Sequence, residues 1–394
     1  MRQKPKATNV LLMDDDVAVS PESIKRTYNL LRILKPQYRE AMISGAMLNY
    51  EVGEDQWEDT GFMTKDGIFA PCKPPLRLTQ FEDIIFNEIH QMTKEITPDN
   101  HYAAWWYCCI PMSVIRRVGL PLPVFVRYDD VEYGIRSHPK FMTMNGICVW
   151  HAKFEIRYNA GVERYQSTRN GMIAQMTTGL APDFDTFLKG LHRQIDLEMR
   201  KFNYTDAELA LDGFEDFLKG PKFIEQPVAQ ERFMRANRLK EQVVPFDELK
   251  QQAAEQGLVG FDPDRLTRQT VETDRPRSLQ ERAFDFVTHN GQRFVRDGQE
   301  GQDGGADYAI ITHDGWAYPS GSIHGKNTIV SIDWASRKGV VRHKDVKRYR
   351  EIVKRYKRDV AYFKKHRSRL EREYQEAAPK LESVSFWKRY LGMA

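Results

Sequence analysis

The chain has 394 residues, of which 41% are hydrophobic and 11% aromatic, and its net charge at neutral pH is only +4. This length allows two or three domains, each with a core of its own. The composition excludes an intrinsically disordered or fibrous protein, and the small net charge by itself indicates no class of partner.

Cysteine usage and hydropathy indicate a cytoplasmic protein. The four cysteines form no Cys-x-x-Cys pair, so we expect reduced thiols. The apolar runs fall far short of the roughly 20 residues that span a bilayer. The basic start of the chain has no apolar segment of the kind found in signal peptides, and we therefore expect neither a signal peptide nor a membrane span.

The pattern over residues 1–180 predicts an α/β domain. Residues 9–13 form a short apolar run typical of a buried strand, and Ser20-Pro21 supplies an N-cap and a first helical position for a helix that ends before Pro36. Further β-like runs at 123–127 and 146–154 each lead into polar, reactive side chains. We expect the functional site to lie at the edge of the sheet where these runs end.

The remainder of the chain changes in character. Residues 181–265 hold charged helical segments, and residues 266–394 combine β-like runs at 284–295, 306–319 and 327–343 with Asn-Gly and Asp-Gly hairpin signals. A basic helix with a near-heptad apolar seam is expected over 344–374. Its seam predicts a contact with another helix, within the subunit or in a homo-oligomer. The alternative is docking on anionic lipid at the inner face of the plasma membrane.

Three adjacent aspartates follow the first predicted strand. In an extended chain successive side chains alternate, so Asp14 and Asp16 would point one way and Asp15 the other. Two carboxylates on one side of a strand end suit a hard divalent cation such as Mg²⁺ or Mn²⁺. The alternative interpretation is a turn or capping cluster ahead of the first helix.

Three more groups carry candidate chemistry. The carboxylates of Asp129 and Asp130 repel each other, so one is a candidate base with a raised pKa, although the pair could equally begin a helix. His151 follows an apolar run and could be a metal ligand, a donor to phosphate or a core histidine. Trp105 and Trp106 could be core residues or could stack against a sugar face.

The order of these motifs is more specific than any one of them. An Asp-Asp-Asp run, a Trp-Trp pair, an Asp-Asp-x-Glu-x-Gly segment, a Trp-His pair and then Tyr165-x-x-x-Arg169-Asn170 resembles family 2 of the inverting GT-A glycosyltransferases. The sequence is most similar to bacterial galactofuranosyltransferases of the galactan-polymerising type, over roughly residues 8–180. The resemblance implies a Rossmann-like nucleotide-diphospho-sugar transferase fold. It also implies transfer of galactofuranose from UDP-galactofuranose, with inversion, to a glycan or lipid-linked glycan.

The resemblance also implies roles for particular residues. Asp14, Asp16 and His151 would hold Mn²⁺ or Mg²⁺ against the donor diphosphate, and Asp130 would be the catalytic base. Four side chains would contact the acceptor: Asp129, Trp105, Trp106 and Glu58. In-line attack on the anomeric carbon needs an activated hydroxyl on one side and a neutralised leaving group on the other, and these residue types supply both.

The resemblance carries an expectation about the extent of the chain. Only eight residues precede Asn9, whereas one βαβ unit takes about 30 residues. The uridine-binding units of a GT-A domain would not fit there, so we expect this chain to be the C-terminal part of a longer enzyme or one piece of a split protein.

Two other functions fit parts of the sequence. A haloacid-dehalogenase-like phosphatase also places Asp-x-Asp after a strand, but Ala18 stands where its Thr or Val would be, and the tryptophan pairs have no role in it. A non-catalytic glycan-binding remnant would fit a chain that lacks its donor-binding half. The sequence contains no motif for nucleic-acid recognition, and we expect no nucleic-acid partner.

Overall fold

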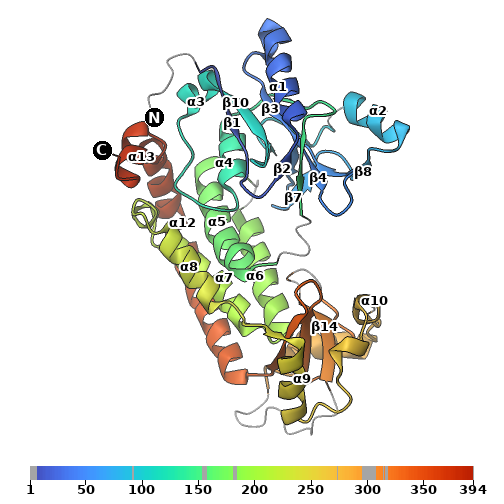
Figure 1. Ribbon diagram of the computed structural model, residues 1–394. Coiled ribbons are helices and arrows are strands. Elements are labelled where there is room, and N and C mark those ends of the chain that lie inside the picture. Colours follow the sequence, from blue (N-terminus) through green and yellow to red (C-terminus); the bar gives the residue numbers. More distant parts are fainter. Residues whose placement is uncertain are drawn as a thin grey trace.

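The computed structural model describes residues 7–90, 93–152, 158–180, 184–272, 274–294, 308–313, 315 and 318–393. It shows a mixed α/β protein with an upper part built on small sheets, a middle part of packed helices and a lower part around one further sheet (Figure 1). The long helix α12 (Val346–Leu381) runs beside the middle part and reaches toward both others. The domain boundaries expected after residues 180 and 265 remain predictions.

The upper part contains twelve short strands and four helices among the described residues. The strands are β1 (Asn9–Leu12), β2 (Ala18–Val19), β3 (Met42–Ser44), β4 (Ala46–Asn49), β5 (Asp55–Glu58), β6 (Gly61–Met63), β7 (Phe69–Pro71), β8 (Leu76–Arg77), β9 (His101–Tyr102), β10 (Cys108–Pro111), β11 (Phe141–Met142) and β12 (Cys148–His151). The helices are α1 (Pro21–Ile33), α2 (Phe81–Ile89), α3 (Met112–Val118) and α4 (Asp129–Arg136), with a 3₁₀ turn at Pro36–Tyr38.

Two of the sheets continue into each other. One has the order β1-β10-β3-β11 and the other β2-β12-β4-β5-β8. Strands β3 and β4 belong to different sheets and are separated by Gly45 alone, whose Cβ, if present, would lie 2.6 Å from the Tyr107 ring. Only glycine allows the backbone to pass this close to the ring. A third sheet, β7-β6-β9, covers the side of the cavity described below.

Two expectations for this part have different outcomes. The start of α1 is confirmed, because the Ser20 hydroxyl accepts a hydrogen bond from the Glu22 backbone N–H at 3.2 Å and Pro21 is the first helical residue. The β-like run at 123–127 is wrong. Residues 126–128 have positive φ angles instead of extended ones and lead directly into α4. A buried side chain far away in the sequence stabilises this conformation, and its hydrogen bonds are described with the candidate active site below.

The middle part consists of α5 (Ser167–Thr178), α6 (Phe184–Arg200), α7 (Tyr204–Leu218) and α8 (Ala229–Leu239), with a π-helical turn η3 (Gly161–Gln166) before α5 and a 3₁₀ turn at Pro221–Phe223. The predicted apolar seam of the basic helix packs inside the chain, against α5 and α7. For example, the Tyr374 ring stacks on Phe217 with centroids 5.5 Å apart. The helix runs over 346–381, longer than the expected 344–374.

Ion pairs with α7 compensate part of the positive charge of α12. Arg348 lies 2.6 Å from Glu208, and Arg355 lies 2.8 Å from Asp212. These two arginines therefore serve the packing of the middle part, and docking of the helix on anionic lipid remains a prediction. No helix in the described part of the chain is both long and apolar enough to cross a bilayer.

The close packing of α7 on η3 predicts an effect on stability. A Cβ on Gly213 would lie 2.3 Å from the carbonyl oxygen of Tyr165, which is a backbone atom and cannot move aside. We expect Gly213→Ala to lower the free energy of unfolding by about 1–3 kcal/mol. Gly190 in α6 has no atom within 4 Å of the same position, so Gly190→Ala should raise stability by about 0.5–1 kcal/mol. Urea denaturation of both variants checks this; equal midpoints would contradict it.

The lower part has the sheet order β13-β16-β15-β14. Its elements are β13 (Val244–Pro245), α9 (Phe246–Glu255), a 3₁₀ turn at Pro263–Arg265, α10 (Arg268–Glu272), α11 (Leu279–Thr288), β14 (Tyr308–Thr312), β15 (Thr328–Asp333) and β16 (Lys338–His343), and the final helix α13 (Val384–Tyr390) packs beside α12 at the other end of the molecule.

Two β expectations for this part are corrected. Strands β15 and β16 form an antiparallel pair within the single β-like run expected at 327–343, whereas β14 and β15 are parallel, so the Asp-Gly signal between them does not mark a hairpin. The run expected as a strand at 284–295 begins inside helix α11. A capping box between Ser278 and Glu281 starts this helix and could have been recognised in the sequence. Residue 295 and residues 306–307, 314 and 316–317 of the β-like runs lie outside the described residues.

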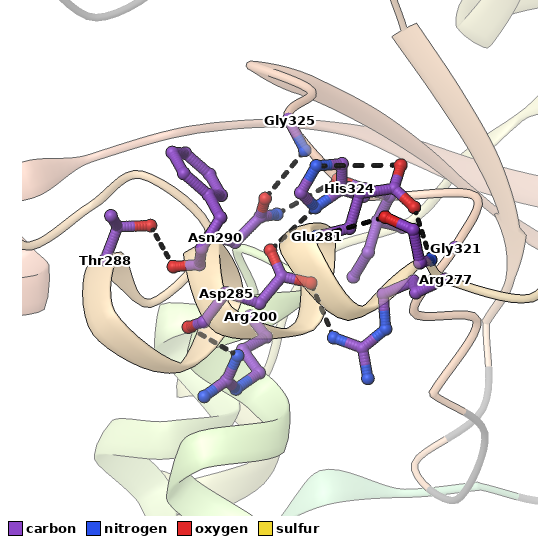
Figure 2. Close-up of polar contacts among 12 residues, drawn as sticks. Arg200, Arg277, Glu281, Asp285, Thr288, Asn290, Gly321, His324 and Gly325 are labelled. Carbon is purple, nitrogen blue, oxygen red and sulfur yellow. Dashed lines mark hydrogen bonds and ion pairs between the residues drawn. The ribbon is translucent and has the colours of Figure 1, made fainter.

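A polar network attaches α11 to its neighbours (Figure 2). The Asp285 carboxylate is paired with Arg277 and lies 2.8 Å from Nδ1 of His324, while the Asp285 backbone carbonyl accepts a hydrogen bond from Arg200 of α6. The Asn290 amide joins the same neighbourhood by donating to the Ile323 carbonyl. The contact with Arg200 connects the lower part to the middle helices, and the others hold α11 within the lower part.

Candidate active site

The upper and middle parts enclose a cavity of about 520 Å³. Side chains from the turn after β1, the end of β5, the loop before β10, the start of α4 and the end of β12 line it. All eight of the site residues predicted from the sequence are among them: Asp14, Asp16, Glu58, Trp105, Trp106, Asp129, Asp130 and His151. The structure therefore brings these residues together, and the role of each remains a prediction.

Asp14, Asp16 and His151 form the candidate metal-binding group. Asp16 Oδ1 lies 3.6 Å from Nε2 of His151, whose Nδ1–H donates to the Ala152 carbonyl at 2.6 Å. Because that carbonyl can only accept, Nε2 of a neutral His151 carries the lone pair and faces Asp16. Burial and then the negative charge of Asp16 raise the pKa of Asp14. Chain reversal after β1 places Asp14 and Asp16 at the cavity through a turn, not through an extended strand.

Two carboxylates and one imidazole are a donor set that fits Mn²⁺ and, less closely, Mg²⁺. Within the described residues, however, no three or more His, Cys, Asp or Glu side chains stand close enough to hold a metal ion as they are. The chemistry of the donor set fits a cation, and the side chains would have to converge around it.

A second group of acids faces the same cavity. Loss of hydration raises the pKa of Glu58 to about 8, and the negative charge of Asp130 adds to this shift. Loss of hydration and the adjacent Asp129 raise the pKa of Asp130 to about 7, while that of Asp129 rises, mainly through desolvation, to about 6. Glu58 Oε1 is buried without a hydrogen-bond partner among the described residues. The cavity thus holds both a protonated carboxyl and a base near neutral pH.

The two tryptophans differ in their surroundings. Trp106 is 7% exposed and its indole N–H donates to the Gly45 carbonyl at 3.0 Å, so most of this side chain belongs to the core. Trp105 is half-buried and packs edge-to-face on Tyr133, with ring centroids 5.7 Å apart. Both line the cavity, and Trp105 is the better placed of the two to present a ring face to a sugar.

The segment before the Asp129-Asp130 pair has an unusual backbone. Val126, Arg127 and Tyr128 have φ angles of 54°, 74° and 66°, a left-handed region that disfavours side chains other than glycine. The amide of Asn170 donates to the carbonyls of residues 125, 126 and 127 at 3.2, 3.1 and 3.0 Å. Asn170 is 1% exposed, and Arg169 donates to its side-chain oxygen, which fixes the direction of the amide. Asn170 therefore stabilises the conformation that aims Asp129 and Asp130 into the cavity.

This contact predicts that Asn170 positions the acids. Asn170→Ala removes the two amide N–H donors that the three carbonyls of a strained segment share, so we expect a loss of about 2 kcal/mol in the free energy of unfolding and a fall of about tenfold in activity. Asn170→Asp keeps the size but cannot donate, and should behave similarly. Gly339→Ala in β16, whose added Cβ would lie 2.7 Å from the Ser331 carbonyl oxygen in a sheet that contributes no residue to the cavity, is the control of lowered stability. Equal activities of the Asn170 and Gly339 variants would contradict a positioning role.

The sequence analysis missed several lining residues. Tyr102, Phe69, Arg127 and Glu163 also form the cavity wall, and Arg127 is paired with Glu163 across it. Glu163 lies four positions ahead of the start of α5, and no motif marked it. Asn170, which contacts the segment before Asp129, did have a signal in the sequence, namely the Tyr-x-x-x-Arg-Asn segment noted above. The four lining residues had none.

The fold and cavity define a mixed α/β protein with a carboxylate-rich, aromatic-lined site open to a small polar ligand. Among characterised proteins, the chain is 23% identical over 411 residues to galactofuranosyltransferase GlfT2 of Mycolicibacterium smegmatis, which covers 97% of this chain and 58% of that protein. It is 26% identical over 226 residues to galactofuranosyltransferase GlfT2 of Mycobacterium tuberculosis, covering 55% of this chain and 35% of the relative. No protein-family model matches the chain.

These similarities make the chain a distant relative of two glycosyltransferases. It spans a little more than half the length of the first relative and about a third of that of the second. At this level of identity the comparison supports the class of chemistry, and the details of donor, acceptor and metal belong to the proposal that follows.

Proposed function

We propose that this chain carries the metal-binding and acceptor-binding residues of a galactofuranosyltransferase active site. The reaction would transfer galactofuranose from UDP-galactofuranose to a glycan or lipid-linked glycan, with inversion at the anomeric carbon. The observation that supports it best is the convergence of all eight predicted residues on one cavity in a chain distantly similar to two galactofuranosyltransferases. Family 2, the GT-A fold and the inverting mechanism are part of this proposal.

The site residues divide by their chemistry into an acceptor-side group, described first, and a donor-side group. Asp130, whose pKa is raised to about 7 by loss of hydration and by Asp129, is suited to accept a proton from the acceptor hydroxyl near neutral pH. Glu58, protonated at that pH, can donate a hydrogen bond to a neighbouring sugar hydroxyl. Trp105 would contact a ring face of the acceptor. This arrangement raises the nucleophilicity of one hydroxyl while holding the sugar in place.

On the donor side, Asp14, Asp16 and His151 would hold Mn²⁺ or Mg²⁺. When bound, such a cation would neutralise charge on the departing diphosphate. The imidazole is oriented for this by its hydrogen bond to the Ala152 carbonyl.

Transfer and acceptor binding by the purified 394-residue chain test the proposal. With UDP-galactofuranose, Mn²⁺ and a galactofuranosyl disaccharide, we expect a trisaccharide that disappears when EDTA is added, and this transfer would contradict the expectation that the uridine-binding units lie outside the chain. Calorimetry should show acceptor binding that weakens in Trp105→Ala. Acceptor binding without transfer, including in the presence of Mn²⁺, would instead indicate a glycan-binding protein. Phosphate release from an aryl phosphate that is lost in Asp14→Asn would indicate the phosphatase alternative.

A further inference from the structure

A buried lysine lies beside the end of β5, outside the lining of the cavity. Lys73 is 6% exposed and forms an ion pair with Asp59, the 2% exposed residue that follows Glu58. Its ammonium group also donates to the backbone carbonyl of Asn87 at 2.9 Å and to the side-chain oxygen of Asn87 at 2.8 Å. These three acceptors match the three N–H groups of the ammonium. The buried charge is therefore fully satisfied by the protein, and its position is fixed.

The same network reaches β5 at a second point. The Asn87 amide on α2 donates to the Gln56 side-chain oxygen at 3.0 Å, and the Gln56 amide donates back at 3.1 Å. Gln56 is 2% exposed and stands two residues before Glu58. After Glu58, the Asp59 backbone carbonyl accepts a hydrogen bond from the Ser44 hydroxyl on β3 at 2.5 Å. The chain is thus held on both sides of Glu58.

Glu58 has little of its own to fix its direction. Its Oε1 atom has no hydrogen-bond partner among the described residues. A Cβ on Gly61 would lie 2.7 Å from that atom, so the absence of a side chain there leaves room for the carboxyl group. The pairing of β4 with β5 is also irregular, because Met47 and Leu48 face Glu58 and Gln56, and a bulge of this kind re-aims a side chain. The backbone around Glu58 therefore sets where its carboxyl group points.

We propose that the Lys73–Asp59 ion pair is a positioning device for the acceptor site, which holds Glu58 in the cavity for a hydrogen bond to an acceptor hydroxyl. The inference rests on the proposed function and adds residues to it that do not touch the acceptor. Lys73, Asp59 and Asn87 do not line the cavity, so they act on the acceptor through Glu58. The lysine is needed because a buried Asp59 carboxylate without a counterion would be strongly destabilising.

Binding of a galactofuranosyl disaccharide to the full chain, measured by calorimetry, tests the inference. Lys73→Met alone would leave a buried carboxylate unpaired, so the variant to use is Lys73→Met with Asp59→Asn, called the paired variant. Replacing both charges of a buried pair by neutral groups of similar size often leaves stability unchanged. The paired variant should bind the disaccharide about tenfold more weakly, the factor expected for the loss of one well-placed hydrogen bond.

The decisive comparison uses a chain in which Glu58 has no carboxyl group. Glu58→Ala should itself weaken disaccharide binding about tenfold, and the paired substitutions should add nothing to that loss, because residues that act through one another are not additive. A merely structural role would give the same further loss in both chains. Arg277→Met with Asp285→Asn is the matched control: it removes an ion pair with a 2% exposed aspartate away from the cavity and should leave binding unchanged.

Gln56→Met is a second variant, which keeps both charges and removes only the link from Asn87 to β5. It should weaken binding about threefold in the unchanged chain and not at all in Glu58→Ala, and it decides the question if the paired variant does not fold. Unchanged or additive effects in folded variants, with binding still sensitive to Trp105→Ala, would overturn the inference and leave the proposed function standing. No disaccharide binding by the unchanged chain would overturn both.

Discussion

Asp130→Asn is expected to lower the rate of galactofuranosyl transfer by about 10²- to 10⁴-fold, while the chain stays folded. A general base contributes 10²–10⁴ to a rate, and the amide of asparagine cannot accept the acceptor proton. The Asp130 side chain also accepts a hydrogen bond from the Val131 backbone N–H at 2.7 Å, and an asparagine oxygen can keep that bond. The variant should therefore retain the start of α4 and the shape of the cavity.

The same substitution should not cost stability at neutral pH. Asp130 lies beside Asp129 in a poorly hydrated site, and both raise its pKa. A neutral amide removes that repulsion, so the free energy of unfolding at pH 8 should equal or exceed that of the unchanged chain. The transfer rate would then fall while the free energy of unfolding stays equal or rises. Loss of a residue with only a structural role would lower both.

Asp99→Asn is the matched control. Asp99 is an exposed aspartate that pairs with His138 at 3.0 Å and does not line the cavity. Asp99→Asn should leave the transfer rate within a factor of two of that of the unchanged chain. Measurement of initial rates with saturating acceptor, together with calorimetric acceptor binding, separates chemistry from binding. An Asp130→Asn variant with more than a tenth of the original rate would place the base elsewhere.

The parts of the site that could be predicted are those with local signals. An apolar strand followed by charged residues, as at β1 and Asp14, can be recognised from consecutive residues alone. The same holds for a helix start such as Ser20-Pro21. Of the two interpretations of Asp129 and Asp130, the helix start is confirmed, since these residues form the first turn of α4. Their role as site acids remains a prediction, with which their place in the cavity wall is compatible.

The parts that could not be predicted depend on distant contacts. Residues 123–127 have the β-branched and aromatic composition of a strand, but the Asn170 amide, 43–45 positions later, stabilises a left-handed conformation there. Tertiary contacts of this kind override local propensity. The strand expected at 284–295 is wrong for a different reason, because the capping box at Ser278 starts a helix that runs into these residues, although the Asn-Gly pair is typical of a hairpin. Arg127 and Glu163 are distant in the sequence and come into contact only in the folded chain.

The acids also make stability depend on pH, and Glu58→Gln should show this most clearly. Loss of hydration holds the pKa of Glu58 near 8 in the folded chain, against an ordinary value of 4.5. Between these values the folded chain keeps a proton that the unfolded chain releases. The free energy of unfolding of the unchanged protein therefore falls as pH rises, by up to about 1.4 kcal/mol per pH unit and roughly 5 kcal/mol in total.

The Gln variant lacks this titration, so its stability relative to the unchanged protein should rise from pH 4.5 to pH 8 and then level off. Subtracting the free energy of unfolding of the unchanged protein from that of the variant at each pH removes the contributions of other titrating groups. One such group is His101, whose pKa is lowered to about 4 by burial. Urea denaturation of metal-free protein at six or more pH values measures this difference. Glu281→Gln is the control of opposite sign, because Arg275 lowers the pKa of Glu281 to about 2 and its contribution is present above pH 4.5 and lost toward pH 2.

A flat difference profile for Glu58→Gln would mean that Glu58 is ionised in the folded chain at neutral pH. It could then only accept hydrogen bonds from the acceptor, and two negative carboxylates, Glu58 and Asp130, would share the cavity at neutral pH. The expected rise, together with acceptor binding that Glu58→Gln preserves, would instead establish Glu58 as a neutral donor beside a basic Asp130. In that case Glu58 would donate a hydrogen bond to one sugar hydroxyl while Asp130 accepts a proton from another at the same pH.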